Sequence, residues 1–300
     1  MSERLSKRGI ELKKLCDSIA KAVSKAVGEM VGTSAGGTMV RMGADGTPTK
    51  SIDKAAEDAV LARLQDSGLG FRVLSEEIGE VTIGDPPYYF LHLDPLDGTF
   101  NAIKGIPFYS VSIYLSKENC HFGYVCDIAY GRSYYAESGK GAYVETGSPL
   151  SSPLPLPSPL PSPIASFSTS SSPSASALCV SKTSILKDFS VSAYTLRPNT
   201  ARIVGVGDTV RRIRTLGSTS LELSLVASGA LDAFIDLRGM LRVVDIAAGK
   251  LILEEAGGLI TDARGKELHL GGNMWQRTDL IGSNGLMHDD LLQIIGGGAN

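Results

Sequence analysis

The 300-residue sequence contains no apolar run that could cross a membrane, which takes about 18 residues or more. Residues 1–14 are rich in Arg, Lys and Glu and lack the apolar core of an export signal. An excess of positive charge is also missing, since 29 Lys and Arg residues face 32 Asp and Glu residues for a formal net charge of −3. We therefore expect a soluble, cytoplasmic protein that binds neither membranes nor nucleic acid.

Cysteine is scarce, and the four residues present, Cys16, Cys120, Cys126 and Cys179, show no C-x-x-C spacing and no histidine pattern beside them. Zinc sites and disulfide frameworks need such clusters, so neither is expected and the four are predicted to be buried thiols. With 43% apolar and 20% charged residues, the composition is that of a folded chain and excludes a disordered one. Its length suits one large domain or two modest ones.

Charge is absent between Glu145 and Lys182, where eight of the fourteen prolines lie among many serines. Proline donates no backbone hydrogen bond and fixes φ, so this stretch favours extended, solvated chain over helix or sheet. We predict an insertion over residues 146–177, between an N-terminal half (1–145) and a C-terminal half (178–300). Its repeated Pro-x-x-Pro spacing is also compatible with a docking strip for a partner protein.

Hydrophobic periodicity predicts the regular elements. Apolar residues spaced by three and four predict helices over 5–30, 53–65, 219–228, 245–256 and 289–295. Alternating or continuous apolar runs predict strands over 71–74, 88–93, 109–115, 122–128, 133–137, 142–145, 178–180, 201–206, 233–237 and 259–261. The glycine-rich segment 31–51 is expected to be a mobile loop or a hairpin. This alternation of helices and strands predicts a layered α/β (α+β) protein.

The most informative motif is Asp-Pro-Leu-Asp-Gly-Thr, which follows an apolar strand. Asp94 and Asp97, with the Leu96 carbonyl and the Thr99 hydroxyl, are hard oxygen donors of the kind that Mg²⁺ or Mn²⁺ prefers. The amides of Gly98 and Thr99 stand at the expected start of a helix, a position that suits a phosphate group. The same residues would also arise if the two aspartates only capped that helix and closed the turn.

Further carboxylates lie at comparable positions. Glu76 and Glu77 end a predicted strand, and Asp53 and Asp245 begin predicted helices. Each of them taken singly is explained as a helix cap or a solvated charge. Together with the Asp-Pro-Leu-Asp-Gly-Thr motif, they favour a carboxylate-rich functional site.

In these motifs the sequence resembles the Mg²⁺-dependent, lithium-sensitive phosphatase superfamily that includes inositol monophosphatase and fructose-1,6-bisphosphatase. The segments that carry the resemblance are 49–53 with Glu57, 75–77, 94–99, 217–223, and 244–249 with 255–258. They span nearly the whole chain apart from the Pro/Ser-rich stretch. Within the superfamily, the strings at 43–50, 100–108 and 235–245 look most like the archaeal-type enzymes, which act on both fructose 1,6-bisphosphate and inositol 1-phosphate.

The resemblance implies a fold and a metal centre. The fold is an αβαβα sandwich of the sugar-phosphatase superfamily, with the active site between its halves, and the expected assembly is a homodimer. Two or three Mg²⁺ ions, or Mn²⁺ in their place, would be held by Glu76, Asp94, Asp97 and Asp245 with the Leu96 carbonyl. The glycine-rich segment before Asp53 would close over the metals.

The resemblance also implies catalytic and substrate-binding residues. Asp53, Thr99 and Glu76 would be catalytic, with Asp53 and Thr99 taking the proton of the attacking water. Substrate contacts would come from Asp97, Gly98, Thr99, Phe100, Arg214, Thr219 and Arg238, the two arginines reaching a second phosphate. Arg214 lies in a basic run that is equally compatible with a solvated strand edge, and Arg242 is expected to be a surface charge at a helix end. Animal-type inositol monophosphatases carry Trp where this chain has Val244, which weakens a pure inositol monophosphatase assignment.

The expected function is hydrolysis of a small sugar or polyol phosphate in carbohydrate metabolism, such as gluconeogenesis. Fructose 1,6-bisphosphate, cleaved to fructose 6-phosphate, and inositol 1-phosphate are the expected substrates. A phosphatase acting on 3′-phosphoadenosine-5′-phosphate or NADP is an alternative, because it would share the metal motifs. A non-catalytic binding protein on the same fold is a second alternative, although the presence of every metal carboxylate and of Thr99 argues against it.

Overall fold

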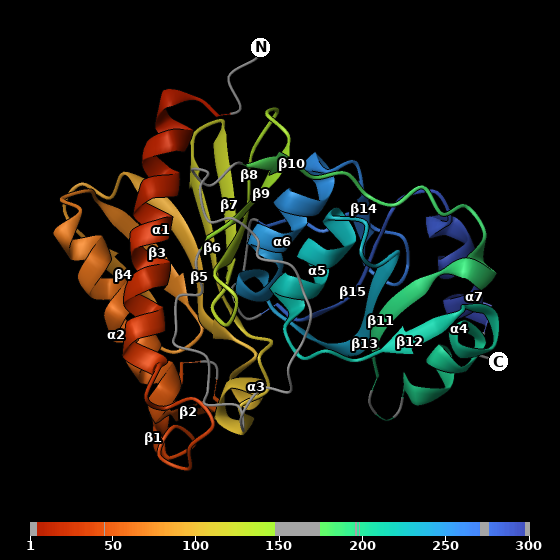
Figure 1. Ribbon diagram of the computed structural model, residues 1–300, viewed down its shortest axis with the longest axis horizontal. Helices are drawn as coiled ribbons and strands as arrows, with labels where there is room; N and C mark the ends of the chain where they lie inside the picture. Colours follow the sequence, from red (N-terminus) through yellow and green to blue (C-terminus); the bar gives the residue numbers. More distant parts are fainter. Residues whose placement is uncertain are drawn as a thin grey trace, which may run out of the picture.

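Helices and β-sheets follow one another in alternating layers across the molecule (Figure 1). The computed structural model describes residues 5–44, 46–147, 175–195, 197, 199–270 and 276–297. Its helices are α1 (Lys7–Val27), α2 (Ser51–Asp66), α3 (Thr99–Lys104), α4 (Val204–Thr209), α5 (Thr219–Ala227), α6 (Val243–Glu255) and α7 (His288–Gly297), with 3₁₀ turns η1 (Leu186–Asp188) and η2 (Asn199–Ile203). A layer of α1 and α2 covers the first large sheet, α5 and α6 separate it from the second, and α4 and α7 cover the outer face of the second. The predicted αβαβα sandwich is therefore confirmed.

The first large sheet has eight strands. In order across the sheet they are β10 (Ser176–Ala177), β9 (Ala142–Thr146), β8 (Arg132–Glu137), β7 (Cys120–Asp127), β6 (Ser110–Lys117), β5 (Tyr89–Asp97), β3 (Phe71–Ser75) and β4 (Gly79–Ile83). Only β3 and β5 pair in parallel, with Ser75 opposite Leu93, and the other pairs are antiparallel. Because parallel strands end at the same edge of a sheet, the residues that follow Ser75 and Leu93 lie side by side.

The outer helical layer forms as the apolar spacing predicts. Helix α1 begins after Ser6, whose Oγ accepts a hydrogen bond from the backbone N–H of Gly9 at 3.0 Å. Its buried stripe includes Leu12, Ile19 and Val23, and packs with α2 on one face of the first sheet. Strands β1 (Met39–Met42) and β2 (Pro48–Lys50) form a hairpin between the two helices, within the segment expected to be a loop or hairpin.

The middle layer is buried on most of its surface because it lies between two sheets. Helices α5 and α6 bury most of their residues and share a core with both sheets. At Gly123 of β7, an added Cβ would lie 2.9 Å from the carbonyl oxygen of Ala248 in α6, so glycine permits the close approach of helix and strand. The second sheet has the order β12 (Arg212–Arg214), β11 (Ser190–Tyr194), β13 (Ala233–Leu241), β15 (Thr278–Ser283) and β14 (Leu259–Thr261).

Some expectations about single elements are wrong. Residues 178–180 form no strand, although the amide of Leu178 donates to the Ala142 carbonyl. Residues 201–206 belong to η2 and α4, because the turn that buries Val206 packs as a helix beside α7. Cys179 is exposed and Cys120 is half-buried, whereas Cys16 and Cys126 are buried as expected. Of the expected insertion, residues 148–174 lie outside the described residues.

No helix among the described residues is long and apolar enough to cross a membrane.

Candidate active site and metal centre

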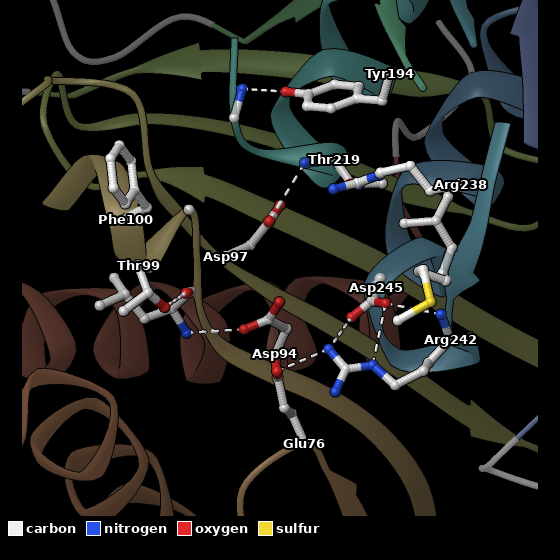
Figure 2. A pocket seen from close by; sticks show the side chains of 15 residues that line it. Glu76, Asp94, Asp97, Thr99, Phe100, Tyr194, Thr219, Arg238, Arg242 and Asp245 are labelled. Atoms are coloured by element: carbon white, nitrogen blue, oxygen red, sulfur yellow. Dashed lines mark hydrogen bonds and ion pairs between the residues drawn. The ribbon is translucent and has the colours of Figure 1, made fainter. Parts of the chain in front are cut away.

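Carboxylates from three elements meet at the edge where β3 and β5 end. Glu76 directly follows β3, Asp94 lies in β5, and Asp245 lies in the first turn of α6. One carboxylate oxygen from each can be chosen so that all lie within 4.8 Å of one another. Figure 2 shows the three side chains converging from different sides. The parallel register of β3 and β5 explains why Glu76 faces Asp94, and the packing of α6 on the sheet brings in Asp245.

Burial and mutual repulsion make Glu76 and Asp94 costly to ionise. Burial is the main cause that raises the pKa of Glu76 to about 8, against the opposing charge of Arg242. Burial also raises the pKa of Asp94 well above its ordinary value, and the charges of Glu76 and Asp97 add to the effect. A cation among the three groups would remove this penalty, because it favours the ionised form of each of them.

The donor set fits a hard divalent cation. The cluster consists of three carboxylates, which offer oxygen donors, and Leu96 lines the same cavity. Oxygen donors of this kind suit Mg²⁺ or Mn²⁺ better than softer metals. Metal binding by Glu76, Asp94 and Asp245 therefore agrees with the chemistry and the spacing of the groups present.

Arg242 occupies an unexpected position. It is the residue before α6, its side chain is 12% exposed, and its Nη2 lies 2.8 Å from Glu76 Oε1 and 2.9 Å from Asp245 Oδ1. Its Nε lies 3.2 Å from Asp245 Oδ2. The expectation that Arg242 is a surface charge is wrong, because the turn that starts α6 directs the guanidinium at the carboxylates (Figure 2).

Asp97 is held differently from the other carboxylates. Its Oδ2 accepts hydrogen bonds from Ser218 Oγ at 2.8 Å, Ser220 N at 2.7 Å and Ser220 Oγ at 2.6 Å, and its Oδ1 accepts from Thr219 N at 3.3 Å. Burial raises the pKa of Asp97 although the hydrogen bonds from Ser220 and Ser218 oppose this. Asp97 therefore caps the N-terminus of α5 from the other half of the chain and fixes the two halves across the cavity.

Thr99 and Asp53 form the contact that the sequence suggested. Thr99 Oγ1 lies 2.7 Å from Asp53 Oδ1 and 3.0 Å from the Leu96 carbonyl oxygen. The Asp53 side chain lies in the first turn of α2, where its Oδ2 accepts a hydrogen bond from Lys50 N at 3.0 Å. Burial raises the pKa of Asp53, which makes its carboxylate a stronger proton acceptor.

A cavity of about 370 Å³ connects these groups. It is lined by Glu76, Asp94, Leu96, Asp97, Gly98, Thr99, Phe100, Tyr194, Gly217, Thr219, Arg238, Met240, Leu241, Arg242 and Asp245. Gly98 turns the chain from β5 into α3 with φ of +96°, and an added Cβ would lie 3.0 Å from the carbonyl oxygens of Gly217 and Phe108. Glycine is therefore required there for conformation and for space. Phe100 lies at the rim and is 68% exposed.

Arg238 approaches the cavity from the second sheet. Its Nε lies 3.1 and 3.0 Å from the two carboxylate oxygens of the fully buried Asp236, and its guanidinium carbon lies 4.6 Å from the centre of the Tyr194 ring. The Tyr194 hydroxyl donates to Glu222 Oε2 at 2.8 Å. Asp236, Tyr194 and Glu222 thus restrict where the Arg238 guanidinium can point.

The structure brings together most of the residues selected from the sequence. Ten of them line the cavity, and Asp53 joins them through its contact with Thr99. Arg214 is not brought in: it is exposed on the edge strand β12 and does not line the cavity. Tyr194, Glu222 and Asp236 were not selected from the sequence, and Arg242 was expected elsewhere. Usable signals were the Asp-x-Arg spacing, which puts two side chains on one face of a strand, and the position of Arg242 three residues before Asp245.

Comparison with known proteins identifies the family. The model of the inositol monophosphatase family matches residues 13–296. A fructose-1,6-bisphosphatase/inositol-1-monophosphatase from Methanothermobacter thermautotrophicus is 38% identical over 291 residues, which cover 92% of this chain and 94% of that protein. A bifunctional NADP phosphatase/NAD kinase from Methanococcus maripaludis is 34% identical over 93% of this chain and 48% of its own length. The solved MJ0109 gene product, an inositol monophosphatase-fructose 1,6 bisphosphatase, is similar with a TM-score of 0.75 and 28% identity, over 94% of this chain and 98% of that one. The chain belongs to the inositol monophosphatase family.

Proposed function

We propose that this chain hydrolyses fructose 1,6-bisphosphate to fructose 6-phosphate and inositol 1-phosphate to inositol. Its family makes it a phosphoric monoester hydrolase, which argues against the alternative of a non-catalytic binding protein. Two proteins to which it is similar carry both activities in their names. The observation that carries the proposal is that the carboxylate cluster and the Thr99–Asp53 pair lie on one cavity.

The residues of this cavity divide the work of water attack on phosphorus. Bound to the cluster, Mg²⁺ would supply a Lewis acid that lowers the pKa of water and neutralises phosphate charge. Thr99 takes the proton of the attacking water while it passes its own proton to Asp53, whose raised pKa favours this transfer. The new bond from water oxygen to phosphorus forms as the ester bond breaks, and the ester oxygen takes up a proton from solvent and leaves as the hydroxyl of the sugar or inositol.

Residues at the turn before α3, in the second sheet and at the start of α5 position the substrate. We assign the backbone amides of Gly98, Thr99 and Phe100 to the reacting phosphate, because these residues line the same cavity as the cluster. Arg238 and Thr219, on the opposite wall, are assigned to the rest of the substrate. A guanidinium held by Asp236 suits a second phosphate, which supports a bisphosphate as substrate. Two or three Mg²⁺ ions, with Asp97 as a further ligand, are part of the proposal.

A nucleotide substrate is the second candidate, because one similar protein is named as a bifunctional NADP phosphatase/NAD kinase. The exposed Phe100 ring at the rim is of the kind on which a base can stack. Stacking there would add affinity for NADP or 3′-phosphoadenosine-5′-phosphate, and none for a sugar phosphate. Phe100→Ala therefore separates the two candidates by its effect on KM.

The test is phosphate release in the presence and absence of Mg²⁺, with fructose 1,6-bisphosphate, inositol 1-phosphate, 3′-phosphoadenosine-5′-phosphate and NADP as substrates. We expect Mg²⁺-dependent turnover that is highest with the first two. Asp94→Asn removes a buried ligand and should lower kcat by at least about 100-fold, whereas the matched control Asp58→Asn changes a carboxylate that is 59% exposed on α2 and should have no effect.

The outcomes distinguish the candidates. Turnover confined to NADP or 3′-phosphoadenosine-5′-phosphate, with a KM raised by Phe100→Ala, would replace the sugar phosphatase assignment by a nucleotide phosphatase. Full activity of Asp94→Asn at saturating Mg²⁺ would remove Asp94 from the metal centre.

A further inference from the structure

We propose that the Arg242 guanidinium takes the place of the metal ion in the metal-free protein, where it holds the clustered carboxylates together. When a divalent cation binds, the guanidinium must move away from them. The inference rests on the metal centre of the proposed function. Its starting observation is that the guanidinium contacts two of the three clustered carboxylates, Glu76 at 2.8 Å and Asp245 at 2.9 Å. A single positive charge thereby bridges ligands that come from different halves of the chain.

Charge repulsion makes the two cations alternatives. A metal held by Glu76 and Asp245 would lie within a few ångströms of a guanidinium bonded to the same carboxylates. Two like charges at so short a distance repel each other strongly, and the repulsion doubles when one of them is a divalent ion. The metal and the present position of Arg242 therefore exclude each other.

The start of α6 lets the side chain leave without disturbing the ligand. The backbone N–H of Arg242 donates to Asp245 Oδ2 at 2.7 Å, so Asp245 keeps a fixed partner when the guanidinium moves. Arg242 already lines the cavity of about 370 Å³, which offers room for the displaced side chain. The long, flexible arginine stem makes this a change of rotamer rather than of fold.

Two consequences follow from this competition. The metal-free protein keeps part of its stability through Arg242, because removal of one partner from a buried ion pair leaves the other charges uncompensated. Metal affinity is lowered by the same interaction, since binding has to break it. Arg242 thus lowers the metal affinity of the site and raises the stability of the metal-free protein.

The experiment measures binding and stability rather than turnover, so its failure is distinct from failure of the proposed activity. Mn²⁺ affinity is measured by titration with paramagnetic resonance detection for wild type, Arg242→Met and Arg242→Lys. We expect Arg242→Met to bind Mn²⁺ at least about 10-fold more tightly and to lower the metal-free Tm by about 5 °C or more. Arg242→Lys, which keeps the charge, should fall between that variant and wild type.

Arg202→Met is the matched control, because it removes a partly buried arginine that is paired with Asp279 and does not line the cavity. It should leave Mn²⁺ affinity unchanged. Unchanged or weaker Mn²⁺ binding by Arg242→Met would overturn the inference. If that variant does not fold without metal, modification of wild-type Arg242 by phenylglyoxal decides: Mn²⁺ should accelerate it, and equal rates with and without Mn²⁺ would contradict the proposal.

Discussion

Among single residues, Thr99 connects two parts of the cavity through its hydroxyl group. It bridges β5 and α2, since its Oγ1 lies near both the Leu96 carbonyl and Asp53. Its partner Asp53 differs from Glu76 and Asp94 in its surroundings. Hydrogen bonds from Thr99 and Lys50 stabilise the ionised form of Asp53, whereas neighbouring carboxylates destabilise the ionised form of Asp94. One set of acidic groups can therefore bind metal while another accepts a proton.

Thr99→Ala removes the proton path and leaves the carboxylate cluster intact. We expect kcat to fall by about 100-fold or more, while Mn²⁺ affinity stays within about two-fold of wild type. Thr99→Ser keeps the hydroxyl and should retain most of the activity. Steady-state kinetics together with Mn²⁺ titration checks this, and a kcat of wild-type size in Thr99→Ala would show that the Asp53–Thr99 pair is not the base.

Arg238 and Arg214 make a second comparison between single residues. Arg238 lines the cavity, whereas Arg214 is exposed on the edge of the second sheet. Arg238→Lys, which preserves a charge beside the buried Asp236, should raise KM for fructose 1,6-bisphosphate by about 10-fold and KM for inositol 1-phosphate much less. Arg214→Ala should change neither KM. A larger effect of Arg214→Ala than of Arg238→Lys on the bisphosphate would mean that the edge strand reads the second phosphate.

At the scale of elements, the loop that leads into α5 is held by a buried acidic side chain. Glu222 is fully buried, and its Oε1 accepts hydrogen bonds from Ser192 Oγ and, at 3.1 Å, from the amide of Leu216. Its Oε2 accepts from Tyr194, whose hydroxyl in turn accepts a hydrogen bond from the Gly217 amide. Glu222 thereby fixes the start of α5, where the contacts to Asp97 are made.

The buried Glu222 predicts a pH dependence of stability. Burial is the main cause that raises its pKa to about 7 from an ordinary value of 4.5, so the folded protein holds this proton more tightly than the unfolded chain. The stability from this group is complete below about pH 4.5 and is lost as the pH rises to about 7, by up to about 3 kcal/mol. Glu222→Gln should lose less stability than wild type between pH 5 and pH 7.5 in guanidinium unfolding. The exposed Glu29→Gln should follow wild type, and parallel losses in Glu222→Gln would refute the account.

Elements with long, regular patterns could be predicted from the sequence, whereas several of the less regular ones could not. The three-and-four spacing of α1 was sufficient to predict a helix, because one face of it is buried. The apolar patterns of β6 to β8 were sufficient to predict strands, because these are long and largely buried. The segment 201–206 was predicted as a strand, since a short apolar run does not distinguish strand from helix. Strand β15 carries Thr278, Asp279 and Gly282, and its interior place in the second sheet follows from tertiary pairing with β13 and β14.

At the scale of the whole molecule, the site exists because two halves of the chain meet. Asp97 of the first sheet contacts the start of α5, and Glu76 contacts Arg242 at the start of α6. The motifs and the resemblance identified the carboxylates and Thr99, because each of these residues belongs to a short motif of neighbouring residues. They could not place Arg242 or Tyr194, whose roles depend on contacts between residues far apart in sequence. The homodimer stays a prediction of the resemblance.

The two ends of the Pro/Ser-rich stretch meet within the first sheet. Strand β10 pairs antiparallel with β9, with Ser176 opposite Val144 and Ala177 opposite Tyr143. The amide of Gly147 donates to the Gly131 carbonyl at 2.9 Å, so the chain is still held on the sheet where the described part stops. A short hairpin loop can therefore join the two strands in place of residues 148–174.

Replacement of residues 148–174 by Asn-Gly should leave kcat and KM within about two-fold of wild type. The replaced stretch contains no charged residue, and the cavity is lined by residues from other segments among those described. Because loop closure costs only about 0.6 kcal/mol per doubling of length, stability should rise by about 2 kcal/mol at most. Steady-state kinetics, guanidinium unfolding and sedimentation velocity on both proteins check this. Loss of activity, or a sedimentation coefficient that drops from dimer to monomer in the shortened chain, would mean that the stretch contacts the site or a subunit interface.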